Sequence, residues 1–263
     1  MTVPLLSTCF AACAATPPRT SLDDEPPRIV SAFFGLDHAL PPQSSLLLEC
    51  REAPGADGIP VTFSRRVVGP IDPRAFTVIT RSGAQLHPAC ATTRPANSPF
   101  KNHTVLLIGE LGRQATDPPV KVVITGPLAL AGGMDAKGLS APVIALSDGP
   151  EMVLALGFKA GSIPSDCPVP RTRTVVMVVW AGGVKPAPGK DDEAHRTGYT
   201  VTTATDRLVP FALGDLHDGN NYVHLCLDRE VQPMRIRFAP GVLVDPNGDR
   251  NPETSVDVSL ERP

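Results

Sequence analysis

The sequence has no excess of positive charge, no membrane-length apolar run after its first residues, and no familiar catalytic motif. Lys and Arg number 24 against 27 Asp and Glu, a net charge of −3. Nucleic acid is therefore not expected as a partner, because proteins that bind it present a basic face. Beyond the first 16 residues no stretch reaches the roughly 18 apolar residues of a membrane helix, so we expect a soluble body.

Short motifs of several enzyme classes are also missing. The chain has no C-x-x-C, so neither a dithiol redox site nor a zinc ribbon is indicated. It has no G-x-S-x-G, which leaves Ser/His/Asp hydrolysis without support. A phosphate-binding loop leads directly into a helix. The glycine pairs at 132–133 and 182–183 precede no predicted helix, so neither is expected to bind phosphate.

Proline, in contrast, is abundant, at 30 of 263 residues, roughly double its average usage. Proline interrupts helices, so long helices are not expected and short strands joined by turns are favoured. With 42% apolar residues the chain can bury a sizeable core, and its length exceeds that of one ordinary domain.

The first 16 residues, MTVPLLSTCFAACAAT, are apolar and rich in small residues. They resemble the apolar part of a bacterial secretion signal. Phe10-Ala11-Ala12-Cys13 resembles a lipoprotein cleavage box in which Cys13 becomes the lipidated first residue, although Phe replaces the usual Leu and no Lys or Arg precedes the run. We expect export to the periplasm or outer cell envelope. The exported protein would be either anchored through Cys13 or released, and the alternative to a signal is a disordered apolar tail.

Six cysteines are present, and Cys9 and Cys13 belong to the signal-like segment. The other four fall two in each half, and we predict the pairs Cys50–Cys90 and Cys167–Cys226. Four cysteines allow three connectivities, and four free thiols are the alternative. Closing loops of 40 and 59 residues would each stabilise the fold by about 4 kcal/mol, and disulfides would agree with an oxidising compartment.

The two halves of the chain are similar to each other. At an offset of 123 positions Pro27 aligns with Pro150, and the segment 76–80 aligns with 199–203. At smaller offsets, 118 and 114, residues 105–107 align with 223–225, and 119–138 with 233–252. The matches keep their order and the offset changes in steps, as loop insertions would produce. We therefore predict a tandem duplication, with a signal-like segment and linker at 1–25 and domains at 26–140 and 141–263.

Each half is predicted to consist of short β-branched or aromatic runs bounded by turn residues. The expected strands are 28–34, 45–49, 60–64, 75–80, 104–109 and 120–125, then 152–158, 174–180, 199–203, 222–227 and 234–238. Residues 175–180 show no alternation, which predicts a central strand buried on both faces with Trp180 in the core. About six strands in 115 residues, with regular turn signals, indicate an all-β fold of two tandem Ig-like β-sandwiches.

Several short motifs resemble the bacterial Ig-like domains of cell-envelope and secreted proteins. The first half has Pro-Pro-Arg-Ile-Val-Ser at its start, Ile-Pro-Val-Thr-Phe-Ser at 59–64, Asp72-Pro73, and a late Gly-Gly-Met-Asp turn at 132–135. The second half has Asp-Pro-Asn-Gly-Asp at 245–249 and replaces Phe-Ser by Trp180-Ala181. The resemblance covers most of residues 26–260. It implies structural, adhesive or ligand-presenting roles and transfers no catalytic residue.

The turn at 245–253 places oxygen-bearing side chains at every second position, an arrangement that can supply ligands to calcium. The aligned turn at 131–137 has a single acid, and Arg250 stands where an EF-hand has glycine. The shared position favours an ordinary turn, in which Asn and Gly adopt left-handed conformations. A calcium-stiffened spacer is the alternative, with candidate ligands Asp245, Asn247, Asp249 and Glu253.

The densest polar cluster lies at 214–224. An Asp beside a His can orient the imidazole for general-base catalysis or metal binding. The candidate catalytic residues are therefore Asp215, His217, Asp218 and His224. The same residue types also form ordinary turns, so a solvated loop is the alternative.

The aligned loop of the first half, 90–103, contains Arg94, Asn97, Lys101 and His103. Equivalent loops should lie at the same end of each sandwich, where binding loops gather. Asp37-His38 has no polar counterpart in the second half, where Ala160-Gly161 aligns with it, so it is either functional or surface variation. Residues 190–193 are expected to form a solvated loop.

The sequence leads to two main hypotheses of function. The first is a non-enzymatic, exported protein of two Ig-like domains that binds a partner, such as a glycan, a protein or a small molecule, through its end loops. The second is an enzyme, an isomerase, cyclase or hydrolase, that uses the cleft between the halves with Asp215, His217, Asp218 or His224 as acid, base or metal ligand.

Overall fold

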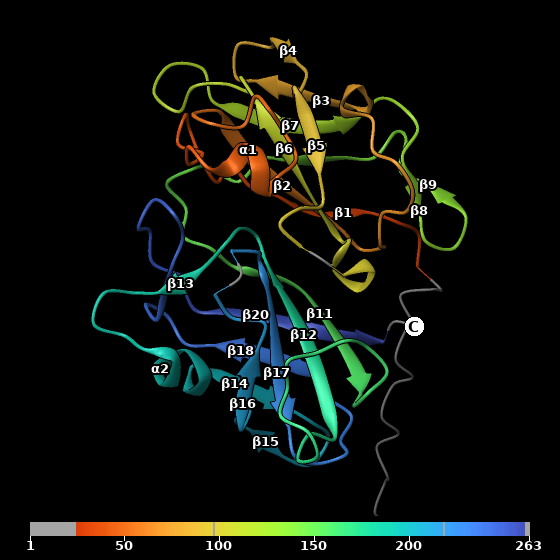
Figure 1. Cartoon of the computed structure of the whole chain (residues 1–263), viewed down its shortest axis with the longest axis vertical. Coiled ribbons are helices and arrows are strands. Elements are labelled where there is room, and N and C mark those ends of the chain that lie inside the picture. The colour runs from red at the N-terminus through yellow and green to blue at the C-terminus, as the bar shows by residue number, and fades with distance from the viewer. Residues whose placement is uncertain (1–24, 97, 218, 261–263) are drawn as a thin grey trace, which may run out of the picture.

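The structure is a computed structural model that describes residues 25–96, 98–217 and 219–260 (Figure 1). The predicted signal segment with Cys9 and Cys13, as well as Asn97 and Asp218, lies outside the described residues. The described chain is mostly β and forms two bodies that lie end to end (Figure 1). No helix in these ranges has the length and apolarity needed to span a bilayer.

The first half contains two antiparallel four-stranded sheets. One has the order β1 (Ile29–Ala32), β2 (Asp57–Phe63), β6 (Thr104–Gly109), β5 (Cys90–Thr92). The other has the order β10 (Ser140–Pro142), β7 (Pro119–Ile124), β3 (Phe76–Thr80), β4 (Gln85–Leu86). A parallel bridge between Phe33 and Ile144 links the β1 and β10 ends, and β8 (Ala129–Leu130) pairs with β9 (Met134–Asp135). The sheets of the first half thus extend a few residues past the predicted boundary at 140.

The second half contains one eight-stranded sheet. Its order is β15 (Arg207–Leu208), β14 (Tyr199–Thr202), β18 (Arg235–Phe238), β20 (Thr254–Leu260), β11 (Met152–Lys159), β12 (Thr174–Trp180), β17 (Tyr222–Leu227), β16 (Ala212–Gly214). The β11–β20 step is parallel. The sheet folds over on itself, because Val178 of β12 and Phe238 of β18 belong to one core. A separate pair joins β13 (Lys185–Pro186) to β19 (Leu243–Val244).

The strand orders of the two halves correspond. With the Phe33–Ile144 bridge counted, the first half runs β5-β6-β2-β1-β10-β7-β3-β4 and the second runs β16-β17-β12-β11-β20-β18-β14-β15. Single residues can therefore be compared by their place in the sheet. Asp57 begins β2 opposite Gly109, and Thr174 begins β12 opposite Leu227.

Each half has its own apolar core. Phe63, Phe76 and their neighbours fill the first, and Trp180 and Tyr199 lie in the second, all without exposed surface. The prediction that Trp180 is a core residue is confirmed. The prediction that its strand is buried on both faces is also confirmed, because every residue of β12 is buried and alternate residues belong to two different clusters.

Both predicted disulfides are present, one in each half. Cys50 pairs with Cys90, and Cys167 pairs with Cys226. Cys50 anchors the long connection between β1 and β2, and Cys167 anchors the connection between β11 and β12. Each bond ties this connection to a later strand of its own half.

Two local predictions were wrong. The predicted strand 45–49 is instead helix α1 (Ser44–Leu47), which begins after Pro41-Pro42 as the Ser44 hydroxyl donates to the Pro41 carbonyl. Its apolar residues suggested a strand, yet Leu46 and Leu47 are 84% and 58% exposed. The predicted loop at 190–193 is wrong for its last two residues, which begin helix α2 (Asp192–Thr197). The Asp191 side chain caps this helix by accepting the Ala194 N–H, and acids fill its first turn.

Candidate functional site

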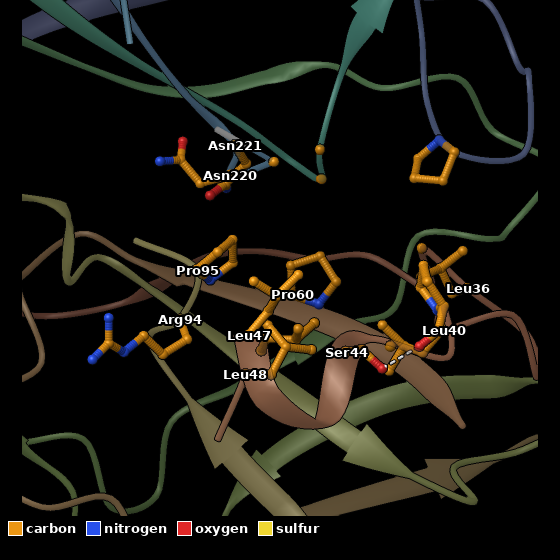
Figure 2. A pocket seen from close by; sticks show the side chains of 18 of the residues that line it. Leu36, Leu40, Ser44, Leu47, Leu48, Pro60, Arg94, Pro95, Asn220 and Asn221 are labelled. Carbon is orange, nitrogen blue, oxygen red and sulfur yellow. Dashed lines mark hydrogen bonds between the residues drawn. The ribbon is translucent and has the colours of Figure 1, made fainter. Parts of the chain in front are cut away.

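A cavity of about 540 Å³ lies between the two halves (Figure 2). Its first-half wall comes from the β1–β2 connection with α1, from Pro60 of β2, and from the segment 93–96. Its second-half wall comes from Gly182-Gly183, residues 219–221 and Pro246-Asn247. In Figure 2, Leu47 of α1, Pro60 and Pro95 face Asn220 and Asn221 across this cleft.

The cleft wall is mainly aliphatic on the first-half side. Leu36, Leu40, Leu47, Leu48 and Leu106 all line it. On the opposite side the amides are already engaged: Asn220 Oδ1 accepts the Tyr222 N–H at 2.7 Å, and Asn221 Nδ2 donates to the Trp180 carbonyl at 2.6 Å. The cleft therefore offers an apolar surface more than a set of directed hydrogen bonds.

Polar contacts fix the two halves relative to each other beside the cleft. Lys101 and Asp215 form a buried ion pair across the interface. The Tyr222 hydroxyl accepts the N–H groups of His103 and Thr104 at 3.1 and 3.0 Å, and Asn247 Nδ2 donates to the Gly35 carbonyl at 2.8 Å. The loops 90–103 and 214–224, aligned in the sequence, thus contact each other.

The predicted catalytic residues do not form one cluster. Asp215 and His217, both with φ of 64°, line a second hollow of about 410 Å³, which shares Gly183, Gly219, Asn220 and Pro246 with the cleft. His217 Nε2 lies 3.0 Å from Asp192 Oδ2. His224 is buried on β17 opposite Met177 and does not line this hollow, and Asp218 lies outside the described residues.

The same hollow is lined by His195, which the sequence did not single out. His195 is buried on α2, with Nε2 3.3 Å from the Tyr199 hydroxyl, and that hydroxyl accepts the Trp180 Nε1–H at 3.0 Å. Burial lowers the pKa of His195 to about 4, and burial also raises the pKa of Tyr199. Both side chains are therefore uncharged at neutral pH and act as polar members of the core.

Three of the four candidate calcium ligands, Asp245, Asn247 and Asp249, form a turn. Asp245 is buried, and its Oδ1 accepts the N–H groups of Asn247 and Asp249, both at 2.9 Å. Burial raises the pKa of the Asp245 carboxyl. Glu253 pairs with Arg237 on β18, and Asp245, Asp249 and Glu253 are not among the described groups whose ligand atoms converge. This arrangement has the geometry of an Asx turn.

A tighter cluster surrounds His38. Its Nδ1 lies 2.7 Å from Asp37 Oδ1 and 3.0 Å from Asp57 Oδ1, and its Nε2 lies 2.7 Å from Glu110 Oε2. Hydrogen bonds with Asp37 and then Glu110 raise the pKa of His38, whereas burial raises the pKa of Asp57. Asp37, His38 and Asp57 could hold a metal ion, because their ligand atoms all lie within 4.8 Å of one another.

The sequence indicated Asp37-His38 by its lack of a counterpart, but it did not indicate Asp57 or Glu110. Asp57 begins β2 and Glu110 follows β6, so the sheet register brings them together. A second convergent group, Cys50, Glu52 and Cys90, is excluded as a metal site, because both sulfurs are in a disulfide.

No protein-family model matches the chain, and no curated protein matches it either. The geometry of the cleft and of the His38 cluster is therefore the basis for assigning a function.

Proposed function

We propose that this chain is an exported, non-enzymatic protein of two Ig-like sandwich domains, derived from one another by duplication, which binds a protein partner in the cleft between them. The corresponding strand orders support the duplication. The signal-like segment and one disulfide in each half support export to the periplasm or outer envelope, with Cys13 as the point of tethering. Calcium is not required by this proposal.

The observation that carries the proposal is the apolar cleft. Its volume of about 540 Å³ falls within the range of ligand pockets. Leu47 lines it and is 58% exposed, and the adjacent Leu46 is 84% exposed, so an apolar surface continues outward from the cleft. Burying one aliphatic side chain of a partner there would contribute about 1.5–3 kcal/mol.

An aliphatic peptide segment fits this wall better than a glycan. The hydroxyl groups of a sugar would lose their hydrogen bonds to water, and leucine and proline side chains cannot replace them. The contacts of Lys101, Tyr222 and Asn247 across the interface hold both walls in place, so binding would need little reorganisation.

The enzyme hypothesis remains the alternative. It would use Asp215 and His217, which line the hollow next to the cleft. Asp215 is engaged in the buried ion pair with Lys101 that joins the two halves, and His217 and Asp192 are 68% and 55% exposed, so little shields a reaction at this pair from water. For this reason the arrangement favours binding over acid–base catalysis.

The cleft can be tested with an environment-sensitive probe, anilinonaphthalene sulfonate, titrated into the folded protein. We expect saturable binding at one site, weakened at least tenfold by Leu47→Asp because the charge would enter the apolar wall. Val169→Asp is the matched control, since Val169 is 89% exposed and lies outside the cleft. Leucine-rich peptides should displace the probe, and neutral oligosaccharides should not.

Three results would contradict the proposal. One is an absence of saturable binding by the native protein. Another is an equal effect of Leu47→Asp and Val169→Asp, which would place the probe elsewhere on the surface. The third is displacement by oligosaccharides alone, which would replace the protein partner by a glycan.

A further inference from the structure

We propose that Asp37, His38 and Asp57 form a binding site for a zinc-class divalent ion, with Glu110 orienting the histidine. This inference is independent of partner binding in the cleft.

The donor atoms match zinc chemistry. One imidazole nitrogen faces two carboxylate oxygens, at 2.7 Å from Asp37 and 3.0 Å from Asp57. In a tetrahedral site with bonds of about 2.0–2.1 Å, neighbouring ligand atoms are about 3.3 Å apart. An outward shift of a few tenths of an ångström would therefore admit an ion, and a nitrogen with two oxygens suits zinc better than calcium.

The supporting contacts orient every donor. Glu110 Oε2 lies 2.7 Å from His38 Nε2, which is the carboxylate–histidine arrangement that fixes the ring of a metal ligand. Asp57 Oδ2 accepts the Leu111 N–H at 2.6 Å, and Asp37 Oδ2 accepts the Gln114 N–H at 3.0 Å. Asp37 is thus held by one oxygen while its other oxygen faces the imidazole. Asp57 is held by both oxygens, because its Oδ1, which faces the imidazole, also accepts the His38 N–H at 2.8 Å and keeps a second lone pair for an ion.

The cluster carries more negative than positive charge. Three carboxylates surround one imidazole, and Asp57 has no exposed surface. Arg113 contacts Glu110 at 3.4 Å on the exposed side. Even with His38 protonated the balance stays negative, so a divalent cation would offset a charge that is costly to bury. The His38 side chain is 24% exposed, which leaves an entry path and room for a water ligand.

The second half shows that the sheet itself does not need these groups. Thr174 takes the place of Asp57 at the start of β12. Its hydroxyl contacts the Arg229 carbonyl at 3.0 Å and the Val231 N–H at 3.2 Å, so one neutral side chain ties down the same corner. Ala160-Gly161 aligns with Asp37-His38. The charged cluster is therefore an addition to the first half rather than a requirement of the fold.

Zinc binding can be measured by titration calorimetry on the full chain. The protein should carry Cys9→Ser and Cys13→Ser, because free thiols would compete for zinc, and no polyhistidine tag. After chelator treatment, zinc chloride at pH 7.5 should bind one ion per chain with a Kd in the micromolar range or below. Calcium chloride should not compete. Cobalt should give the visible absorption of a tetrahedral site.

Variants separate this site from the rest of the chain. His38→Ala and Asp37→Asn should weaken zinc binding at least a hundredfold, and Glu110→Gln about 10–100-fold. His217→Ala is the matched control, because His217 is another exposed histidine beside a carboxylate, and it should leave the affinity unchanged. The Glu110 side chain is 71% exposed, so we expect Glu110→Gln to fold. This variant therefore tests the zinc site even if His38→Ala does not fold.

Several outcomes would overturn the site. Zinc binding no tighter than millimolar would do so. Unchanged affinity in both folded His38→Ala and Glu110→Gln variants would place the ion elsewhere. Equal competition by calcium would exclude the zinc class. The probe titration at the cleft is unaffected by any of these results, so failure of this site and failure of the proposed function are distinguishable.

Discussion

The two halves of the molecule share a strand order but differ in what fills their interiors. The first core is apolar at the places where the second has polar aromatic groups: Phe63 corresponds to Trp180, and Phe76 to Tyr199. His195 of α2 packs against Tyr199 in the second half. The same sheet arrangement thus accommodates either purely apolar side chains or hydrogen-bonded aromatic side chains at these positions, provided that each buried polar group has a hydrogen-bond partner.

The connection after the first strand differs even more. In the first half, residues 33–56 contain α1, Asp37-His38 and Cys50, and they form one wall of the cleft. In the second half, residues 160–173 are shorter and lie over a sheet face with Cys167. The strands therefore carry the fold, whereas this connection carries the features that we connect with function.

The largest expected effect on stability comes from removing a disulfide. Comparing the two disulfides tests whether both halves depend on them to the same extent for their stability. Replacing both cysteines of either pair by alanine should lower the free energy of unfolding by about 4 kcal/mol. The loss should be larger for Cys167/Cys226, by about 1 kcal/mol, because both sulfurs are buried and their removal leaves a cavity, whereas Cys90 is partly exposed. Urea unfolding followed by circular dichroism measures both.

Equal losses would mean that loop closure alone matters and that the buried sulfurs add nothing. A larger loss for Cys50/Cys90 would contradict the comparison. The single tryptophan, Trp180, gives a second signal specific to the second half. If circular dichroism changes at a lower urea concentration than Trp180 fluorescence, the first half unfolds by itself.

Much of the fold followed from local sequence patterns. The expected strand at 174–180 coincides with β12, and the one at 222–227 with β17, because both runs are rich in β-branched, aromatic and other apolar residues and are bounded by clear turn signals. Strand β20 (Thr254–Leu260) was not predicted, because its Thr, Ser and Asp residues are not typical of a buried strand. Only some of its side chains are buried, so the sequence shows no clear apolar pattern there. Helix α1 was mistaken for a strand because four residues are too few to show a helical period.

The candidate sites were harder to predict, because they depend on contacts between distant residues. Asp37 and His38 are neighbours, but Asp57 and Glu110 join them through the pairing of β2 with β6. The cleft depends on the packing of one half against the other, which no local pattern encodes. In contrast, the residues of 214–224 were singled out by local polarity, and the structure distributes them between an ion pair, a surface contact and a buried strand.

A smaller effect should appear when the pH is lowered, and it belongs to the second half. Since the folded pKa of His195 is about 4 and the unfolded value is near 6.5, protons bind the unfolded state first. Stability is therefore complete above pH 6.5 and falls with pH, by about 3 kcal/mol in total once pH 4 is reached. The first half differs, because hydrogen bonds with Asp37 and Glu110 raise the pKa of His38. The stability that His38 contributes is therefore lost as the pH rises and not as it falls.

Urea midpoints at pH 7 and pH 4.5, followed by Trp180 fluorescence, measure this loss. His195→Gln should remove the part of the pH dependence that comes from this residue, whereas His217→Gln, at an exposed neighbour, should leave it. Burial is the largest cause of the low pKa of His195; the charge of Asp192 raises this pKa and that of His217 lowers it, both to a smaller extent. A pH dependence that is the same in His195→Gln as in the parent protein would show that His195 is accessible to protons in the folded state.

The smallest expected effect comes from making the second core resemble the first. Tyr199→Phe places the Phe76 side chain at the corresponding position and removes the hydroxyl that accepts the Trp180 Nε1–H. The buried indole N–H then loses its hydrogen bond, and His195 Nε2 loses its longer contact with the same hydroxyl, which together should cost about 1–2 kcal/mol. Adding Trp180→Phe removes the stranded donor as well, so the double variant should lose less stability than the sum of the two single variants. Circular dichroism of urea unfolding measures all three. Additive losses would mean that the hydrogen bond contributes nothing and that the two cores differ in shape alone.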